Sequence, residues 1–286
     1  MQTNFFVKSH GLGNDYIVLD AENLSFSLRP ELVIRLCDVH FGIGSDGILL
    51  KVPSEKADFG LRIYNTDGSL AENCGNGLRI FSKFLYDYKY TQSKKFTVEI
   101  MGRIVHCEIT GLFDGKVSQV QVDMGKANFH CPEIPAIFSK EECINENLNC
   151  GDKTFAITCV SMGNPHCVVL RNELDMNEVL TYGTQIENNE MFPKRTNVQF
   201  AKVFDRNRVE IRIWERGVGH TLASGSSSCA VAAAMLRNNL IDNIVTIQMQ
   251  GGELHIEIDP EWNVRMTGAV AEIAQGTLSS EVLLQI

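Results

Sequence analysis

The sequence predicts an α+β protein made of two similar, strand-rich halves, each wrapped around a central buried helix. Short runs of β-branched and aromatic residues, separated by Gly, Asn and Asp, recur along the whole chain. Two helix-like segments follow small glycine-containing turns, and the same polar residues recur 150 positions apart. A chain of 286 residues suits two units, and its 44% of hydrophobic residues supports a core in each.

The expected strands fall into two sets, one in each half. In the first half they cover residues 5–8, 16–20, 47–52, 61–64, 95–100, 103–109 and 117–124. In the second half they cover residues 155–160, 167–171, 196–203, 208–214, 244–248, 253–258 and 263–267. The polar segment 126–152 contains two prolines and is expected to connect the halves. We therefore expect one half from 1–128 with 274–286, and the other from 129–273.

Three segments are expected to be helical: residues 30–39, 77–88 and 227–238. In the second segment, Leu78, Phe81 and Leu85 recur at helical spacing. The third segment is apolar nearly all round, and such a helix must be buried. Segments 77–88 and 227–238 are therefore the expected central helices.

An internal duplication links the two halves. Each copy carries a Gly-Asn pair, then a polar residue after a strand, then a small polar residue before the central helix. These are Gly13, Asn14, Asn65 and Cys74 in the first copy, and Gly163, Asn164, Glu215 and Ser224 in the second. The period is too long for a solenoid, so it favours two half-proteins that face one cleft. Such a cleft would have Cys74 on one wall and Ser224 on the other.

Composition and charge exclude several classes of function. The net charge of −9 argues against nucleic-acid or anionic-membrane binding. No apolar run is long enough for a membrane span, and no leader-like start is seen. Nine cysteines without a C-x-x-C pattern fit a reducing cytoplasm. The spacings of His130, Cys131, Cys143 and Cys150 match no standard zinc pattern, so no metal is expected.

The starts of the two central helices carry the predicted chemistry. Helix N-termini expose unpaired N–H groups, bind carboxylates and lower the pKa of a nearby thiol. Two such ends facing one substrate carboxylate would stabilise the charge that develops when an α-proton is removed. Cys74 and a second proton carrier on the opposite face could then invert the stereocentre without a cofactor. Ser224 alone would be a plain helix N-cap, but its place in the repeat favours a site role.

A glycine pattern at residues 42–47 matches G-x-G-x-x-G. A dinucleotide-binding fold needs a strand before this pattern and a helix after it. The following residues, 48–52, read as a strand, so we interpret the pattern as a turn.

The chain resembles the diaminopimelate epimerase family. The matching stretches are HGLGND (10–15), GIGSDG (42–47), NTDGS (65–69), ENCGNG (72–77), MGNPH (162–166), RTNV (195–198), ERGVG (215–219) and MTG (266–268). They span nearly the whole chain in the order of the family. The resemblance implies a pyridoxal-independent, two-base epimerase that converts LL-diaminopimelate to the meso form, acting in the cleft between its halves. Related enzymes also suggest a homodimer.

The resemblance also implies roles for individual residues. Cys74 would be one catalytic base, with the residue at position 224 as the other. Backbone N–H groups of Gly75, Asn76, Gly225 and Ser226 would bind the reacting carboxylate. The amino and carboxylate groups of the amino-acid substrate would be held by Asn14, Asn65, Asn164, Asn197, Glu215 and Arg216. His166 either tunes the thiol or is a packed, hydrogen-bonded histidine.

The sequence departs from the family pattern at Ser224, where the family carries a second cysteine. A serine hydroxyl is a far weaker acid and base than a thiol near neutral pH. The serine is either an introduced replacement of that cysteine or a natural residue. If it is natural, either Ser224 or a water carries the proton slowly, or the chain has changed its substrate or its reaction. His220 is a second departure. The alternatives are a racemase of another amino acid such as histidine or lanthionine, a dehydratase, or a catalytically dead amino-acid-binding module.

Overall fold

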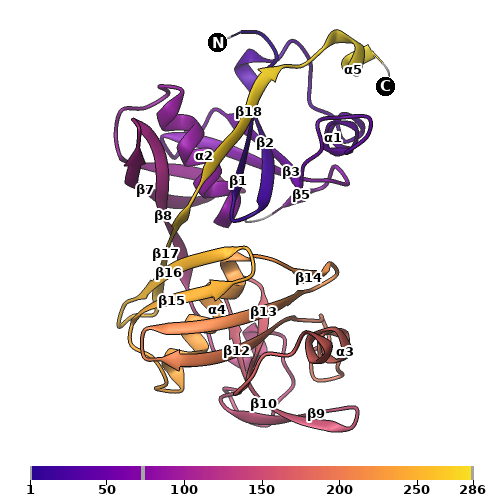
Figure 1. Cartoon of the computed structure of the whole chain (residues 1–286), viewed down its shortest axis with the longest axis vertical. Helices are drawn as coiled ribbons and strands as arrows, with labels where there is room; N and C mark the ends of the chain where they lie inside the picture. The colour runs from indigo at the N-terminus through magenta and orange to yellow at the C-terminus, as the bar shows by residue number, and fades with distance from the viewer. Residues whose placement is uncertain (1, 72–74, 285–286) are drawn as a thin grey trace. The chain divides into compact units, whose positions relative to one another are not determined.

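The computed structural model describes residues 2–71 and 75–284, with no side-chain description for 283 and 284 (Figure 1). Cys74 lies outside the described residues. The chain forms two compact units, Met1–Val122 with Gly268–Ile286, and Asp123–Thr267. We call them unit 1 and unit 2. Both chain crossings between the units lie six residues earlier than the boundaries expected from the sequence.

Unit 1 contains most of the strands of the first half and the last strand of the chain. Its strands are β1 (Phe5–Gly11), β2 (Asn14–Asp20), β3 (Gly47–Val52), β4 (Phe59–Asn65), β5 (Leu70–Ala71), β6 (Lys95–Ile100), β7 (Arg103–Phe113), the start of β8 (Lys116–Lys126), and β18 (Ala271–Thr277). Its helices are η1 (Ala21–Asn23), α1 (Pro30–Cys37), α2 (Gly75–Asp87) and α5 (Ser280–Leu284).

Unit 2 repeats this order of elements. Its strands are β9 (Glu146–Cys150), β10 (Lys153–Ser161), β11 (Pro165–Leu170), β12 (Asn197–Asp205), β13 (Arg208–Glu215), β14 (Gly219–Thr221), β15 (Ile244–Met249), β16 (Gly252–Ile258) and β17 (Asn263–Ala269). Its helices are η2 (Cys131–Glu133), α3 (Met176–Glu187) and α4 (Gly225–Arg237). The predicted strand-rich α+β class with two similar halves is confirmed.

The duplication extends to strand register. Parallel β2 and β3 pair Ile17 with Ile48, and parallel β11 and β12 pair the residues 150 positions later, Cys167 with Val198. Helices α2 and α4 keep the same offset, since they begin at residues 75 and 225 and each has 13 residues. After the helices the offset falls to 149, because the β6–β7 and β15–β16 pairings differ by that number.

The two units differ in the strand that completes each sheet. In unit 1, β1 pairs on one side with β18 from the end of the chain (Figure 1). In unit 2, the equivalent strand β10 pairs with β9, which directly precedes it. The C-terminal strand therefore belongs to the first half. Residues 274–286 were assigned to this half from the sequence, but the strand itself was not predicted. Strands β5, β9 and β14 and helix α5 were also missed.

The central helices are buried, as predicted, although each begins two residues before the expected start. In α4 the residues from Cys229 to Met235 are at most 1% exposed. Helix α2 is different, because Arg79 and Lys83 are buried with its apolar residues. Lys83 pairs with Asp87 at 2.7 Å and donates to the Val117 carbonyl. A buried charge needs such partners.

Helix α3 was not expected from the sequence. Asp175 is its N-cap and accepts a hydrogen bond from the Asn177 amide, and Val179, Tyr182 and Ile186 form its buried face. These residues follow helical spacing, so the signal was present. Helix α3 takes the place in unit 2 that α1 has in unit 1.

Two interpretations of sequence patterns can now be checked. Residues 42–47 form a turn that leads directly into β3, so a dinucleotide-binding helix does not follow the glycine pattern. A Cβ atom at Gly42 would lie 2.0 Å from the Arg35 carbonyl oxygen, which explains this glycine by packing. Within the described residues, no helix has the length and apolar character needed to cross a membrane.

Candidate active site

Ser224 lies at the start of helix α4. It is the N-cap residue, with an extended backbone (φ −146°, ψ 125°), but its side chain makes no capping hydrogen bond. Instead, the hydroxyl lies beside the Glu215 carboxylate and lowers the pKa of that group. The expected alternative of a plain N-cap is therefore wrong for the side chain. The first N–H groups of the helix, at Gly225 and Ser226, receive no side-chain cap from Ser224, and such groups favour an anion.

Glu215 ends β13, directly beside the start of α4. Its Oε1 atom accepts a hydrogen bond from the Thr221 hydroxyl at 3.0 Å. Burial raises the pKa of the Glu215 carboxyl, and the bonds from Thr221 and Ser224 only partly oppose this effect. A carboxyl group with a raised pKa exchanges protons more readily near neutral pH. The start of α4 thus places the Ser224 hydroxyl beside a carboxyl group with a raised pKa.

Asn164 follows a glycine turn and lies next to a buried histidine. Gly163 has a φ of +91°, and Gly13 at the equivalent place in unit 1 has +87°. Glycine adopts this conformation without strain, which explains the Gly-Asn pair in both copies. Asn164 Oδ1 lies 2.9 Å from Nε2 of His166, and Gln199 Nε2 lies 3.0 Å from the other ring nitrogen.

His166 is fully buried, and burial lowers its pKa to about 3. The nearby positive charge of Arg216 acts in the same direction, while the hydrogen bond with Gln199 opposes it. The imidazole is therefore neutral near pH 7. His166 is thus packed and hydrogen-bonded, and its expected role in tuning the thiol stays a prediction. The thiol that it was expected to tune, Cys74, lies outside the described residues.

Asn197 and Arg216 meet where β12 begins and β13 ends. The Arg216 backbone N–H donates to Asn197 Oδ1 at 3.0 Å, and Asn197 Nδ2 donates to the Pro165 carbonyl at 2.9 Å. The Arg216 guanidinium donates to the Lys194 carbonyl at 3.2 Å. These bonds fix the turn that carries Arg216, and Asn197 braces that turn.

The buried carboxylate of Glu187 holds the same turn from the α3 side. It accepts hydrogen bonds from the Gly217 backbone N–H and from Trp214 Nε1, each at 2.8 Å. It also pairs with Arg195 at 3.0 Å. Sequence reasoning missed Glu187 because it missed α3, and no motif marks it. Glu187 therefore positions Trp214 and Gly217, the two residues that flank the pair Glu215 and Arg216.

In unit 1, Asn14 is held by a chain of side chains. Its Nδ2 donates to Asp46 at 2.7 Å, and its Oδ1 accepts from Asn76 Nδ2 at 3.1 Å. Asn76 Oδ1 in turn accepts from the buried Arg79 guanidinium at 2.8 Å. The structure thus brings two predicted residues, Asn14 and Asn76, together and adds two that were not predicted, Asp46 and Arg79.

The other predicted residues of unit 1 are less connected. Asn65 is exposed at the end of β4, where its Nδ2 donates to the Ser69 hydroxyl at 3.0 Å. Gly75 is buried at the start of α2, and its carbonyl accepts from Arg79 at 3.3 Å. Asn65 is therefore placed by its own turn and not by the network around Asn14.

The three cysteines and the histidine considered as zinc ligands do not form a zinc site. Cys131, Cys143 and Cys150 belong to the apolar core of unit 2, while the His130 ring is half exposed beside Glu133. Within residues 2–71 and 75–284, no group of three or more His, Cys, Asp or Glu side chains could hold a metal ion.

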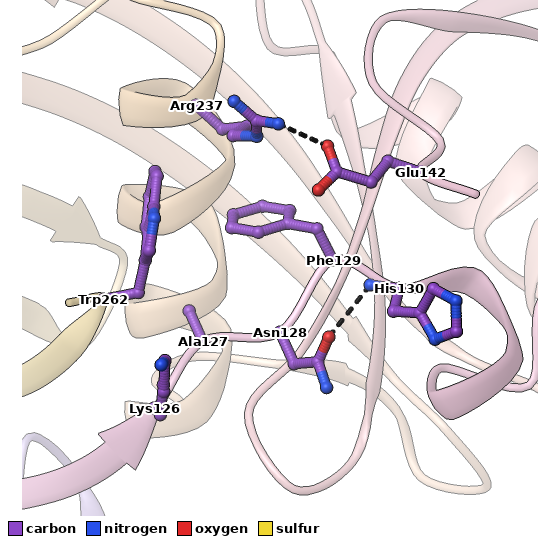
Figure 2. Close-up of a pocket in the computed structure, with 8 residues that line it drawn as sticks. All are labelled: Lys126, Ala127, Asn128, Phe129, His130, Glu142, Arg237 and Trp262. Atoms are coloured by element: carbon purple, nitrogen blue, oxygen red, sulfur yellow. Dashed lines mark hydrogen bonds and ion pairs between the residues drawn. The ribbon is translucent and has the colours of Figure 1, made fainter. Parts of the chain in front are cut away.

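A surface hollow of about 530 Å³ lies elsewhere in unit 2 (Figure 2). Its lining includes Phe129 and Trp262, and Arg237, whose guanidinium donates to Glu142. Figure 2 shows the Arg237 guanidinium directed at the Glu142 carboxylate. None of the residues predicted for the site lines it, so it is not the candidate active site.

Comparisons with known proteins identify the family. A family model described as diaminopimelate epimerase matches residues 6–130 and 158–273. Diaminopimelate epimerase 2 of Nostoc sp. is 45% identical over 97% of this chain and 96% of its own length. The enzymes of Heliobacterium modesticaldum and Methanococcus maripaludis are each 41% identical over 96% of this chain and 99% of their own. The chain belongs to the diaminopimelate epimerase family. It is therefore an isomerase of the epimerase and racemase class.

Solved structures show the same fold at much lower identity. A probable proline racemase of Agrobacterium radiobacter has a TM-score of 0.71 at 11% identity, covering 96% of this chain and 92% of that one. A hydroxyproline epimerase of Agrobacterium vitis has a TM-score of 0.70 at 10% identity, covering 96% and 90%. The fold of the diaminopimelate epimerase family is thus shared with isomerases of other names.

Proposed function

We propose that this chain epimerises LL-diaminopimelate to meso-diaminopimelate by a two-base mechanism without a cofactor. The bases are Cys74 and the residue at position 224. Full-length similarity to enzymes named diaminopimelate epimerase supports the reaction. The observation that carries it is the place of Ser224, at the N-cap of α4, 150 positions after Cys74 and beside Glu215.

In this reaction one base removes the α-proton, and the electron pair spreads onto the substrate carboxylate. The group on the opposite face then delivers a proton to the α-carbon, which inverts the centre. Backbone N–H groups of Gly75, Asn76, Gly225 and Ser226 stabilise the charge on the carboxylate. The remaining polar groups of the substrate are held by Asn14, Asn65, Asn164, Asn197, Glu215 and Arg216.

Ser224 sets the rate of this proposed reaction. Its hydroxyl has a far higher pKa than a thiol, so it gives and takes protons slowly on its own. Glu215 provides the missing acid or base, because its carboxyl pKa is raised and it lies beside the hydroxyl. A proton can then pass between Glu215 and the substrate through the Ser224 oxygen. A slow epimerase follows from this arrangement.

Further parts of the proposal concern the whole protein. The protein works as a homodimer in the cytoplasm, on a small amino-acid substrate. A catalytically dead amino-acid-binding module is the second candidate, because Ser224 stands where the repeat has Cys74.

Deuterium uptake tests the proposal. The chain is incubated in D₂O with LL-diaminopimelate, and separately with L-histidine and lanthionine, beside a Ser224→Cys variant. Mass spectrometry and chiral chromatography then measure α-deuteration and stereochemistry. Deuterated meso product from either protein supports the epimerase. Tight binding without exchange in both proteins supports the binding module, and a keto-acid product indicates a dehydratase.

A further inference from the structure

The buried Gln199 side chain connects three elements of unit 2. It lies on β12, two residues after Asn197, and is 0% exposed. Its Nε2 atom lies 3.0 Å from His166 Nδ1 on β11 and donates to the Ser227 hydroxyl, also at 3.0 Å, in the first turn of α4. Gln199 thus joins the histidine beside Asn164 to the start of the helix that Ser224 caps.

We infer that Gln199 fixes the proton of His166 on Nε2 and thereby makes Asn164 present its amide NH₂ group outward, toward a carboxylate of the substrate. Gln199 is then a positioning residue that selects for a ligand carboxylate. The choice of ligand rests on the proposed function, whereas the position of the proton does not.

The proton position follows from the donors and acceptors. Two partners surround the Gln199 amide nitrogen, and its Oε1 atom has no hydrogen-bond partner among the described residues. In this orientation the amide nitrogen faces both partners, so it donates to the Ser227 hydroxyl and His166 Nδ1 accepts. A neutral imidazole then carries its proton on Nε2, which donates to Asn164 Oδ1 at 2.9 Å. The protonated form is disfavoured by full burial and by the nearby Arg216 charge.

The orientation of Asn164 follows in turn. Because its Oδ1 is held by His166, its Nδ2 points away from the ring and makes no hydrogen bond to any described residue. An amide NH₂ group can donate to a carboxylate but cannot accept from an ammonium group. With the opposite tautomer, Asn164 would have to turn over and present its carbonyl, which favours an ammonium group.

The first test reads the tautomer in the unaltered chain. Long-range proton–nitrogen NMR of ¹⁵N-histidine-labelled protein distinguishes a protonated Nε2 from a protonated Nδ1, and a His166→Leu sample assigns the signal among the seven histidines. We expect the proton on Nε2. A proton on Nδ1 would overturn the inference without bearing on whether the protein is an epimerase.

The second test measures ligand selectivity in a Gln199→Met variant. L-Lysine is LL-diaminopimelate without one of its carboxylates, so the affinity ratio of the two ligands reports a carboxylate contact. Loss of the donor should weaken the binding of LL-diaminopimelate by about tenfold and change the affinity for L-lysine by less than about twofold. Thr158→Val is the matched control, since Thr158 is another buried polar residue of unit 2 that bonds elsewhere, to Asn238 and the Asn145 amide.

The outcomes separate the inference from the proposed function. If Gln199→Met weakens the binding of both ligands equally, Gln199 has a merely structural role and the inference is overturned. The same holds if Thr158→Val shows the same loss of selectivity. A parent chain that does not distinguish the two ligands would overturn the proposed substrate, and with it the selective part of the inference. The NMR result still decides the tautomer.

Discussion

Asn14 and Asn164 occupy equivalent places in the two units, yet different networks hold them. Asn14 lies between charged groups, because it donates to Asp46 and accepts from Asn76, which is itself held by Arg79. Asn164 is held by a neutral network in which His166 is the partner of its carbonyl. Duplication has therefore preserved the backbone while the side chains behind each asparagine have changed completely.

The change is visible position by position. The place of Arg79 in unit 1 is taken by Cys229 in unit 2, and the place of Leu49 is taken by Gln199. Unit 1 therefore buries a cation in its central helix, whereas unit 2 buries a neutral amide in a strand. A cation fixes its partner by charge, but a neutral amide can fix a tautomer. The two halves therefore orient the same residue type with different chemistry.

The largest expected effect comes from making position 224 match position 74. Ser224→Cys should raise the rate of α-proton exchange with LL-diaminopimelate by about 100-fold or more, because a thiol exchanges protons near neutral pH and a hydroxyl does not. Exchange into solvent deuterium measures it. Ser228→Cys is the control, since it adds a thiol to the same helix one turn inside, where the side chain is buried. An equal rise in both variants would contradict a specific role for position 224.

The next comparison sets the charged network against the neutral one. Arg79→Met should lower the free energy of unfolding by about 2–4 kcal/mol, because it leaves buried acceptors of Asn76 and Gly75 without their donor. Arg79→Lys should recover only part of this loss, since lysine lacks the planar fork. Gln199→Met should cost less, about 1–2 kcal/mol, because only neutral hydrogen bonds are lost. Denaturant unfolding checks the order, and equal costs would contradict the contrast between the networks.

The difference between the two asparagine networks could be predicted from the sequence only in part. The offset of 150 located Asn14, Asn164, Glu215 and Ser224, because a repeated pattern is visible without any structure. Strand and central-helix positions followed from local periodicity. The groups behind the asparagines could not be found in this way, since Gln199 and His166 are 33 residues apart and meet only through parallel strand pairing. Arg79 lies in the predicted helix 77–88, but nothing in the pattern marks it as a buried cation.

Glu187 offers a smaller test of the same contrast, because the equivalent residue of unit 1 is Cys37. Glu187→Gln replaces one acceptor oxygen by a donor, so the carboxylate can no longer serve both Trp214 and Gly217. We expect a loss of about 1–2 kcal/mol in unfolding free energy and weaker ligand binding through the Arg216 turn. Glu190→Gln, an exposed neighbour, is the control and should change neither quantity. No change in Glu187→Gln would mean that the turn is held by its backbone alone.

The smallest expected effect is the pH dependence that Glu215 gives to unit 2. Burial raises the pKa of this carboxyl above its ordinary 4.5, so the folded state holds a proton that the unfolded state has already lost. The stabilising contribution is thus fully present below pH 4.5 and is lost as pH rises through the folded pKa. Relative to Glu215→Gln, the parent should lose roughly 1 °C to 3 °C of Tm between pH 4.5 and pH 8. Comparing the two proteins cancels the titration of all other groups.

Thr221→Val sharpens this last measurement. Its hydroxyl donates to Glu215 and opposes the effect of burial, so its removal should raise the carboxyl pKa further and deepen the loss at high pH. In unit 1 the equivalent of Glu215 is Asn65, which is exposed and carries no charge. Changing Asn65 to Ala should leave the pH profile unaltered. A profile that moves with Asn65 but not with Thr221 would show that the pH dependence does not come from the Glu215 carboxyl, and would remove the support for Glu215 as the proposed proton partner of Ser224.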